Sequence, residues 1–463
     1  MNRTRIAPPA IARSIAGTVV RGAVIGLGLG LALGIEAGAA RAATWDVTPD
    51  PSQPEDRVGA VVAQASSGDT VRIAPGTYYE HVALDGKSLV FLGTSGAEST
   101  ILDGSRAIAG RAGSIFYRTT DDPAGLTIHG LTLRKGSGTQ LGFDGVAGGA
   151  IHWSGDAAGT WLEISDCVFE ENSTGEGNVL AVGGGAIWAS PIGRVEISGT
   201  RFTGNLTEAY GGALLVEGED AVILEGCEFE SSHGIHFGSF LYVDMQQTSI
   251  HDCTFRSSCD AGTADPIGIL IVSGPVVAIR NNRFLDEGSV PLATRLRLQG
   301  PGPSEQVRLE GNLFHHAMGA DSAAAPVVEL NYTVGDVQVR GNTFVRCGFD
   351  SRSGGLVFEN NIVARGNVVL AQQGPGDAAC NDIWKGALEN GIPGFEVRDN
   401  ISADPMFCSE PSGDFRIAYE SPCEAANTGG CGTIGALGAS CNVVRTKSLS
   451  WGAMRWSFRA EKP

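Results

Sequence analysis

Hydrophobic and polar residues alternate with a period of two in a short segment that recurs along the chain. The clearest copies run from Leu162 to Phe169 and from Val195 to Phe202. Successive closing phenylalanines are 26 to 33 residues apart, and the later ones are Phe229, Phe255, Phe284, Phe314 and Phe344. Strict alternation of this kind is typical of a half-buried β-strand. The pattern therefore predicts one such strand in each repeat.

A second apolar element precedes the alternating segment in several repeats. It reads Gly-Gly-Ala followed by Ile or Leu, at residues 148–151, 184–187 and 211–214. The high glycine content and the missing 3.6-residue period disfavour helical repeats. A propeller blade would need four strands in about 40 to 45 residues. Units of about 26 to 36 residues with two or three short strands instead predict the rungs of a β-solenoid, stacked about 4.8 Å apart.

The repeats also resemble a known family. The strand ends in Phe-x-x-Asn at 169–172 and 202–205, and with the Gly-Gly-Ala-Ile element it resembles the repeats of bacterial polymorphic outer-membrane proteins. Over residues 55–441 the chain is similar to secreted right-handed parallel β-helix proteins of the pectin-lyase-like fold, whose first rung resembles residues 68–80. The resemblance implies an all-β, single-stranded right-handed parallel β-helix of about ten rungs. It implies no single activity, because this scaffold hosts lyases, hydrolases and adhesins.

Four segments are expected along the chain. Residues 1–42 have the basic, apolar and small-x-small order of a secretory signal peptide. Residues 55–375 should form the β-helix, with an N-terminal cap made by a short amphipathic helix whose apolar positions are 58, 61, 62 and 65. Residues 376–441 are rich in cysteine and should form a C-terminal cap. Residues 442–463 are a basic, aromatic tail, interpreted either as a surface-attachment segment or as a frayed terminus.

Charge and length narrow the class of protein. The chain has 51 acidic and 33 basic residues, and loss of the signal peptide, with five arginines and one glutamate, changes the net charge from −18 to −22. Such a chain gains nothing from neutralising phosphates, so nucleic acid is not an expected partner. No apolar run reaches the roughly 20 residues of a membrane helix. We expect a secreted or cell-surface protein, monomeric, whose partner is a polysaccharide or a cell-surface glycan or protein.

Two groups of cysteines are candidates for disulfides. Cys227 and Cys253 fall on neighbouring rungs, within the Cα separation that a disulfide tolerates, but a pair of buried free thiols fits equally well. The C-terminal group is expected to staple the cap over the exposed strand edges of the last rung, with its connectivity open and one member left over. It consists of Cys380, Cys408, Cys423, Cys431 and Cys441.

Alignment of the repeats produces columns of equivalent residues. The turn before the closing strand places four asparagines in register, which we expect to form a structural ladder of amide hydrogen bonds. These are Asn282, Asn312, Asn342 and Asn361. An outward column of charged residues is interpreted either as a groove for a charged polysaccharide or as a surface ladder of ion pairs. It supplies the catalytic candidates His251, Arg280, Glu310 and Arg340.

The Gly-Gly-Ala strand predicts a further outward column. If Ile151, Ile187 and Leu241 face the core, then His152, Trp188 and Tyr242 face outward as candidate ligand-binding residues. An exposed aromatic stripe suits stacking of sugar rings. The alternatives are the opposite register, or burial of the stripe under the excursions at 134–147 and 171–183.

The chain carries no recognisable catalytic or cofactor motif. The Asp clusters of pectate lyases and the Asn-Thr-Asp signature of polygalacturonases are missing, and His315-His316 would point to opposite faces of a strand. No cofactor is predicted, and calcium, although compatible with the fold family, has no support. We therefore expect a non-catalytic β-helix that binds glycan or surface partners through one lateral face. The alternatives are a polysaccharide lyase or glycoside hydrolase, and a structural adhesive component.

Overall fold

The computed structural model describes residues 42–108, 113–118, 120–141, 145–155, 159–175, 181–234, 240–257, 267–286, 294–299, 305–316, 326–331, 335–370, 376–390 and 395–442. Structural statements refer to these residues. Contacts divide the chain into residues 1–41 and 42–463. The expected signal peptide and tail therefore lie outside the described residues, apart from their bordering residues 42 and 442.

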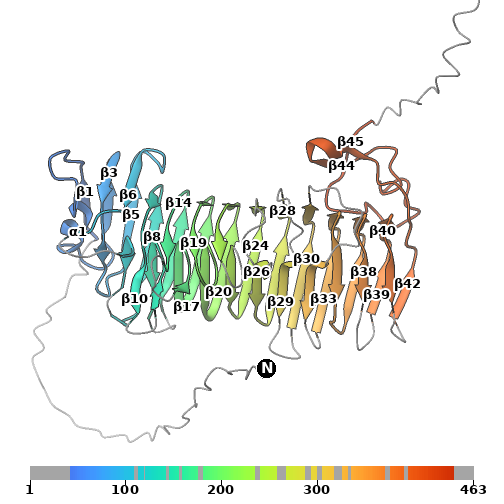
Figure 1. The fold of residues 1–463 in the computed structure, drawn as a ribbon, viewed down its shortest axis with the longest axis horizontal. Coiled ribbons are helices and arrows are strands. Elements are labelled where there is room, and N and C mark those ends of the chain that lie inside the picture. The colour runs from blue at the N-terminus through green and yellow to red at the C-terminus, as the bar shows by residue number, and fades with distance from the viewer. Residues whose placement is uncertain are drawn as a thin grey trace, which may run out of the picture. The chain divides into compact units, whose positions relative to one another are not determined.

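The described chain is a right-handed parallel β-helix whose rungs stack in chain order (Figure 1). Each rung contributes strands to three columns, and each strand pairs in parallel with its equivalent in the next rung. The first column contains β4 (Val82–Ala83), β7 (Phe116–Tyr117), β12 (Ile151–Trp153), β17 (Ile187–Ser198), β20 (Leu214–Glu225), β23 (Leu241–Asp244), β26 (Ile267–Ser273), β29 (Thr294–Gln299), β32 (Pro326–Asn331), β35 (Gly348–Ser351), β38 (Val368–Leu370) and β41 (Leu388–Asn390).

The second column is joined to the first, because β17 and β20 run through both. Its other strands are β1 (Thr44–Val47), β2 (Thr70–Ile73), β5 (Leu89–Gly93), β8 (Gly125–His129), β13 (Trp161–Ser165), β24 (Gln247–His251), β27 (Val276–Arg280), β30 (Glu305–Glu310), β33 (Gly335–Arg340), β36 (Leu356–Glu359), β39 (Gly376–Ala379) and β42 (Phe395–Arg398).

The third column is a separate sheet of twelve strands in the described part of the chain. It comprises β3 (Gly76–Tyr79), β6 (Thr100–Asp103), β9 (Thr132–Arg134), β14 (Val168–Glu170), β18 (Arg201–Thr203), β21 (Glu228–Glu230), β25 (Thr254–Ser257), β28 (Arg283–Asp286), β31 (Leu313–His316), β34 (Thr343–Val345), β37 (Ile362–Ala364) and β40 (Asp382–Trp384). The fold class is as predicted. The sequence predicts about ten rungs, and the third column has twelve strands in the described residues.

The repeated phenylalanines form the centre of the core. From Phe169 to Phe344 they are fully buried and stack ring on ring, with centroids 4.6 to 4.9 Å apart. The alternating pattern explains this arrangement, because successive side chains of a strand point to opposite faces. In β13, for example, Leu162 and Ile164 are buried while Glu163 between them is exposed. One rung spacing brings equivalent rings into contact.

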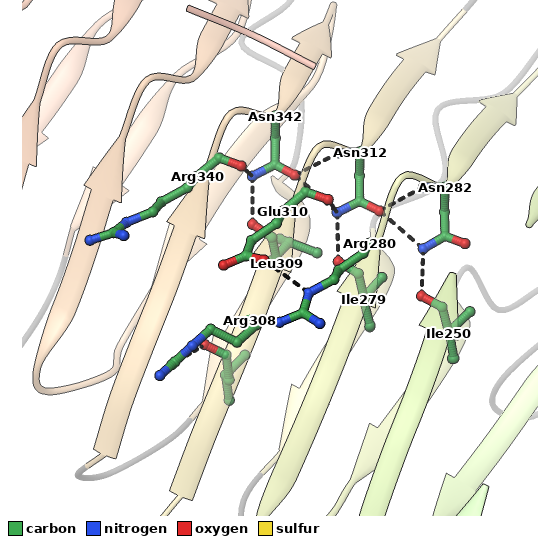
Figure 2. A network of polar contacts seen from close by, with 11 residues as sticks. Ile250, Ile279, Arg280, Asn282, Arg308, Leu309, Glu310, Asn312, Arg340 and Asn342 are labelled. Carbon is green, nitrogen blue, oxygen red and sulfur yellow. Dashed lines mark hydrogen bonds and ion pairs between the residues drawn. The ribbon is translucent and has the colours of Figure 1, made fainter. Parts of the chain in front are cut away.

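The asparagines form a continuous buried ladder in the turn between the second and third columns (Figure 2). Each side-chain amide donates to the amide oxygen of the next asparagine at 2.8 to 3.0 Å. The ladder includes the four expected residues and continues through Asn381 to Asn400. A second, shorter ladder joins Asn172 to Asn205 at the far end of the third column. The amides satisfy buried backbone groups that a two-residue turn would otherwise leave unpaired.

The N-terminal end carries the expected short helix, α1 (Arg57–Val62), which buries Val58 and Val62 against the first rungs. Glu80 is buried beneath it and accepts hydrogen bonds from the backbone N–H groups of Val58 and Gly59. Burial raises the pKa of Glu80 to about 7, although these backbone donors oppose the shift.

Shorter strands lie outside the three columns. β10 (Thr139–Leu141), β11 (Gly145–Ala147) and β16 (Ala181–Gly183) form one three-stranded layer in the excursions between rungs, and β15 (Ser173–Thr174), β19 (Leu206–Thr207) and β22 (His233–Gly234) form another. The C-terminal cap contains β43 (Phe407–Ser409), the 3-10 helix η1 (Glu410–Ser412), β44 (Asp414–Ala418) and β45 (Ala439–Cys441).

The described contacts of the cap run along the side of the rungs, whereas the sequence suggested a cover over the last strand edges. Cap residue Phe415 packs on Leu313 and Val345 of the third column. Glu410 binds Arg346 at 2.9 Å and also pairs with Arg365. The expected start of the cap at residue 376 is also wrong, because β39 to β42 still pair as rungs up to Arg398.

Two disulfides, Cys380–Cys431 and Cys408–Cys441, staple the cap as predicted. Cys423 is not part of a disulfide. It is buried and its thiol donates to Asp382 Oδ2 at 3.1 Å. Burial raises the pKa of both groups.

Cys227 and Cys253 are also free buried thiols, so their disulfide interpretation is wrong. Each thiol donates to the carbonyl oxygen two residues before it, at 3.5 Å in Cys227 and 3.3 Å in Cys253. Asn312 makes the same contact to Glu310 further along the stack. The two thiols therefore occupy the ladder position as weak donors, and the Cys253 sulfur also accepts a hydrogen bond from the backbone N–H of Cys227.

Candidate functional site

The predicted aromatic column is present in the expected register. His152 pairs with Trp188, Trp188 with Leu215, and Leu215 with Tyr242 across neighbouring first-column strands. Their inward neighbours, such as Ile187 and Leu214, are fully buried. Trp188 and Tyr242 are half-buried, so each presents part of its ring to solvent.

His152 is not an exposed binding residue, which corrects the expectation from the sequence. It is 4% exposed and stacks on Trp188 with ring centroids 4.7 Å apart. Burial lowers its pKa to about 4, so the ring is neutral near neutral pH. Leu215 in the same column is also buried, because the layer formed by β10, β11 and β16 places Gly183 against it. One of the excursions considered from the sequence thus covers part of the stripe.

A smaller aromatic patch remains at the surface, formed by Trp188, Tyr210 and Tyr242. Tyr210 is 37% exposed and its ring centroid lies 5.5 Å from that of Tyr242. Burial, followed by the nearby charges of Glu217 and Asp244, raises the pKa of Tyr242. The patch is therefore rimmed by carboxylates. Sequence reasoning missed Tyr210 because it lies in an excursion, outside the aligned columns.

The predicted charged column forms ion pairs between neighbouring rungs. Arg280 binds Glu310 at 2.9 Å, as Figure 2 shows, and Arg340 binds Glu359 at 3.4 Å. His251 lies 3.1 Å from Asp252. The side chains of the two pairs between rungs are at least 31% exposed, so each of these pairs contributes roughly 0.2–1 kcal/mol. The arrangement is that of a surface salt-bridge ladder, in which Arg280 and Arg340 are each paired with a glutamate of the next rung.

A charged cluster that the sequence did not reveal lies further along the first column. Arg297, Glu329 and Asp350 are in register on consecutive strands β29, β32 and β35. Arg297 binds Glu329 Oε2 at 3.0 Å, and both side chains are about three-quarters buried. Burial raises the pKa of Asp350, and its Oδ1 is buried without a hydrogen-bond partner. No repeat motif marks these strands, because they lack the Gly-Gly-Ala element.

A hollow of about 390 Å³ opens at the corner between the first and second columns. Trp161, Arg194, Glu219 and Asp220 line it together with Thr160 and the glycines at 159 and 193. The residues come from three consecutive rungs, since Trp161 pairs with Arg194, and Arg194 with Ala221. We refer to it as the Trp161 hollow. Sequence reasoning missed it because the aligned template began one residue later, at Leu162.

A larger cleft, of about 620 Å³, lies where the cap meets the third column. Arg283 and Leu313 line it from the rungs, and Asp414, Phe415 and Arg416 line it from the cap. Arg416 is held by Asp414, which it contacts at 2.7 Å. Phe415 also packs against His315, at 4.6 Å between ring centroids.

The described residues contain neither a candidate metal cluster nor a candidate membrane-spanning helix. In that part of the chain, His, Cys, Asp and Glu side chains form no group of three that could hold a metal ion. Within the same residues there is no helix with the length and apolar character needed to cross a membrane.

The chain matches two families over part of its length. Residues 185–376 match the right handed beta helix region, and residues 166–190 match the Chlamydia polymorphic membrane protein repeat. No curated protein matches the chain. Each match covers less than half of the chain, and both lie within the segment whose repeats resemble these families.

Solved structures show similarity at low identity. A mutant of the PL6 family alginate lyase AlyGC is 14% identical over 77% of this chain and 39% of that one, with a TM-score of 0.34. The A-module of the Azotobacter vinelandii mannuronan C-5 epimerase AlgE6 is 14% identical over 75% of this chain and 93% of that one, with a TM-score of 0.27. Pectate lyase Pel9A is 13% identical over 87% and 98%, with a TM-score of 0.28. This chain spans well under half the length of the first.

Proposed function

We propose that this protein is an exported, non-catalytic β-helix that binds a glycan through the aromatic patch of Trp188, Tyr210 and Tyr242. The observation that carries the proposal is the partial exposure of these three rings on one lateral face. A sugar ring buries one apolar face against an aromatic plane. The two rings of the first column are two rungs apart, about 10 Å by strand spacing, which is close to the repeat of a disaccharide in an extended glycan.

The charge around the patch supports a ligand without carboxylates. The negative charges of Glu217 and Asp244 both help to raise the pKa of Tyr242, and the whole chain has a net charge of −18. A polyuronate would be repelled by this surface, whereas an uncharged or cationic glycan would not. The charges of Arg280 and Arg340 in the second column are already balanced by Glu310 and Glu359.

A glycan array followed by calorimetry tests the proposal. Tyr210→Ala removes an exposed ring and should weaken binding severalfold with little loss of stability. Trp188→Ala should weaken binding more, at some cost in stability because it also removes the stack on His152. Tyr419→Ala, an exposed tyrosine of the cap, is the matched control. Failure of every glycan to bind, or equal binding by the patch variants and the control, would refute the proposal.

Glycoside hydrolysis is a second candidate, favoured by Glu329 and Asp350. Their paired backbones are one rung apart, near 5 Å, and a carboxylate pair about 5–5.5 Å apart suits a retaining mechanism. Glu329, which pairs with Arg297, would be the nucleophile, while Asp350, whose pKa is raised by burial, would be the acid. Release of reducing ends that is lost in both Glu329→Gln and Asp350→Asn would establish this activity. A product absorbing near 235 nm would instead indicate a lyase.

A further inference from the structure

The Trp161 hollow is a built depression with an aromatic wall. The indole of Trp161 lies over Gly125 of the preceding rung so closely that a Cβ atom there would sit 1.9 Å from the ring. Glycine at this position lets the ring lie against the sheet as a shelf. Gly159 and Gly193 also line the hollow, and neither adds a side chain to it. A hollow of about 390 Å³ falls within the roughly 300–1,000 Å³ of small-ligand sites.

The charges around this shelf are unbalanced. Arg194 is engaged by Glu196 on the same strand. Glu219 and Asp220, both exposed, line the opposite side of the hollow. One cation and three carboxylates leave a local charge of −2. An aromatic face combined with excess carboxylate is the chemistry that recognises an ammonium group, through cation–π and charge attraction together.

Strands β17 and β20 contribute residues both to the hollow and to the aromatic patch with its acidic rim. Trp188 and Arg194 are both on β17, and Glu217 and Glu219 are both on β20. Six residues of extended strand span about 20 Å, so one oligosaccharide bent over the corner could reach both. This continuity selects a glycan, rather than an isolated amine, as the occupant.

We propose that the Trp161 hollow binds an amine-bearing sugar unit of the glycan held by the aromatic patch. The inference rests on the proposed glycan-binding function and adds the chemical class of the ligand. The indole face stacks on the ring of an amino sugar. Glu219 and Asp220 lie across the hollow, where they attract its protonated amine.

The experiment compares two ligands that differ only at the amine. β-1,4-Linked glucosamine oligomers and their N-acetylated counterparts of equal length are titrated into the full protein at a pH where the free amine is protonated. The wild-type protein should bind the free-amine oligomer roughly three- to tenfold more tightly, because two exposed charge pairs and a cation–π contact each contribute modestly. The preference should decrease as salt is raised.

Charge-neutral variants then locate the site. Glu219→Gln with Asp220→Asn should reduce the ratio of the two affinities to near one while the acetylated oligomer still binds. Glu228→Gln with Glu230→Gln removes the same charge from the exposed surface of β21 and should leave the ratio unchanged. Both pairs are exposed, so neither should unfold the protein. Trp161→Ala should lower the affinity for both oligomers.

The outcomes separate the two proposals. If the free-amine and acetylated oligomers bind equally, or if the β21 control lowers the ratio as much as the hollow variant, the inference is wrong while glycan binding stands. If the free-amine oligomer binds and Trp161→Ala has no effect on it, the hollow is not the amine site. If no glycan binds and Tyr210→Ala changes nothing, the proposed function itself fails.

Discussion

Asn312→Ala tests the role of the asparagine ladder. In the native protein the Asn312 amide oxygen accepts from the backbone N–H of Asn282 at 2.9 Å, and its amide nitrogen donates to Ile279 O at 2.8 Å. Truncation to alanine removes the amide, so the backbone N–H of Asn282 and the carbonyl oxygen of Ile279 each lose this hydrogen-bond partner. The neighbouring amides keep other contacts, since Asn282 still donates to Ile250 O and Asn342 still accepts from the Asn312 backbone.

The expected cost follows from these two groups. A buried polar group that loses its partner costs about 1–3 kcal/mol, so Asn312→Ala should lower the free energy of unfolding by roughly 2–6 kcal/mol. Arg280→Ala on an adjacent rung breaks an exposed ion pair and should cost about 1 kcal/mol or less. Urea unfolding followed by circular dichroism compares the two variants.

Amide hydrogen exchange gives a second, local measure of the same change. The Asn282 amide should exchange faster in Asn312→Ala, because it has lost its acceptor, while amides several rungs away keep their protection. If Asn312→Ala is no more destabilising than Arg280→Ala, or if the Asn282 amide stays protected, the ladder is not a source of stability.

Three further predictions concern stability. Removing the Cys408–Cys441 or the Cys380–Cys431 disulfide should lower the free energy of unfolding by about 4 kcal/mol at most, because the two bonds close loops with sequence separations of 33 and 51 residues. Urea unfolding measures this loss against a Tyr419→Ala control. If stability does not change, the cap is held in place without the disulfides. Glu80 has a folded pKa of about 7, above its unfolded value, so its contribution to stability is fully present below about pH 4.5 and is lost as pH rises to 7; in Glu80→Gln this part of the melting-temperature profile should be flat. His152 behaves oppositely, since its folded pKa of about 4 lies below the unfolded value, and stability should fall as pH drops from about 6.5 to 4; a His152→Gln variant with an unchanged profile would contradict this.

Much of the architecture could be predicted because a solenoid repeats its constraints. A one-residue slip would turn every core side chain outward, so the closing phenylalanines specify the register of the third column, and the alternating segments before them specify that of the second. The same argument placed Trp188 beside His152 and Asn312 beside Asn342. Both pairings follow from the alternation of apolar residues within a repeat and from the length of the repeats.

The candidate site could be predicted only in part, because it depends on segments that do not repeat. Leu215 is buried against Gly183 of β16, a strand that lies in an excursion without a periodic signal. Asp350 and Glu329 meet only because two repeats of different length place them on adjacent strands. Trp161 can lie over Gly125 only because Gly125, in the neighbouring rung, has no side chain. The alternation of apolar residues within a single repeat does not reveal such a contact between rungs.

The lateral docking of the cap gives the two ends of the rod different mechanical properties. Rungs of a repeat protein contact only their neighbours, so such proteins tend to unzip from an end. Here Cys431 is tied to Cys380 and Glu410 to Arg346 and Arg365, so the final rungs cannot peel away one at a time without undocking the cap. The C-terminal rungs and the cap should therefore melt as one cooperative block. Unravelling under heat or tension would then proceed from the N-terminal side, where the described chain is covered by the six-residue helix α1.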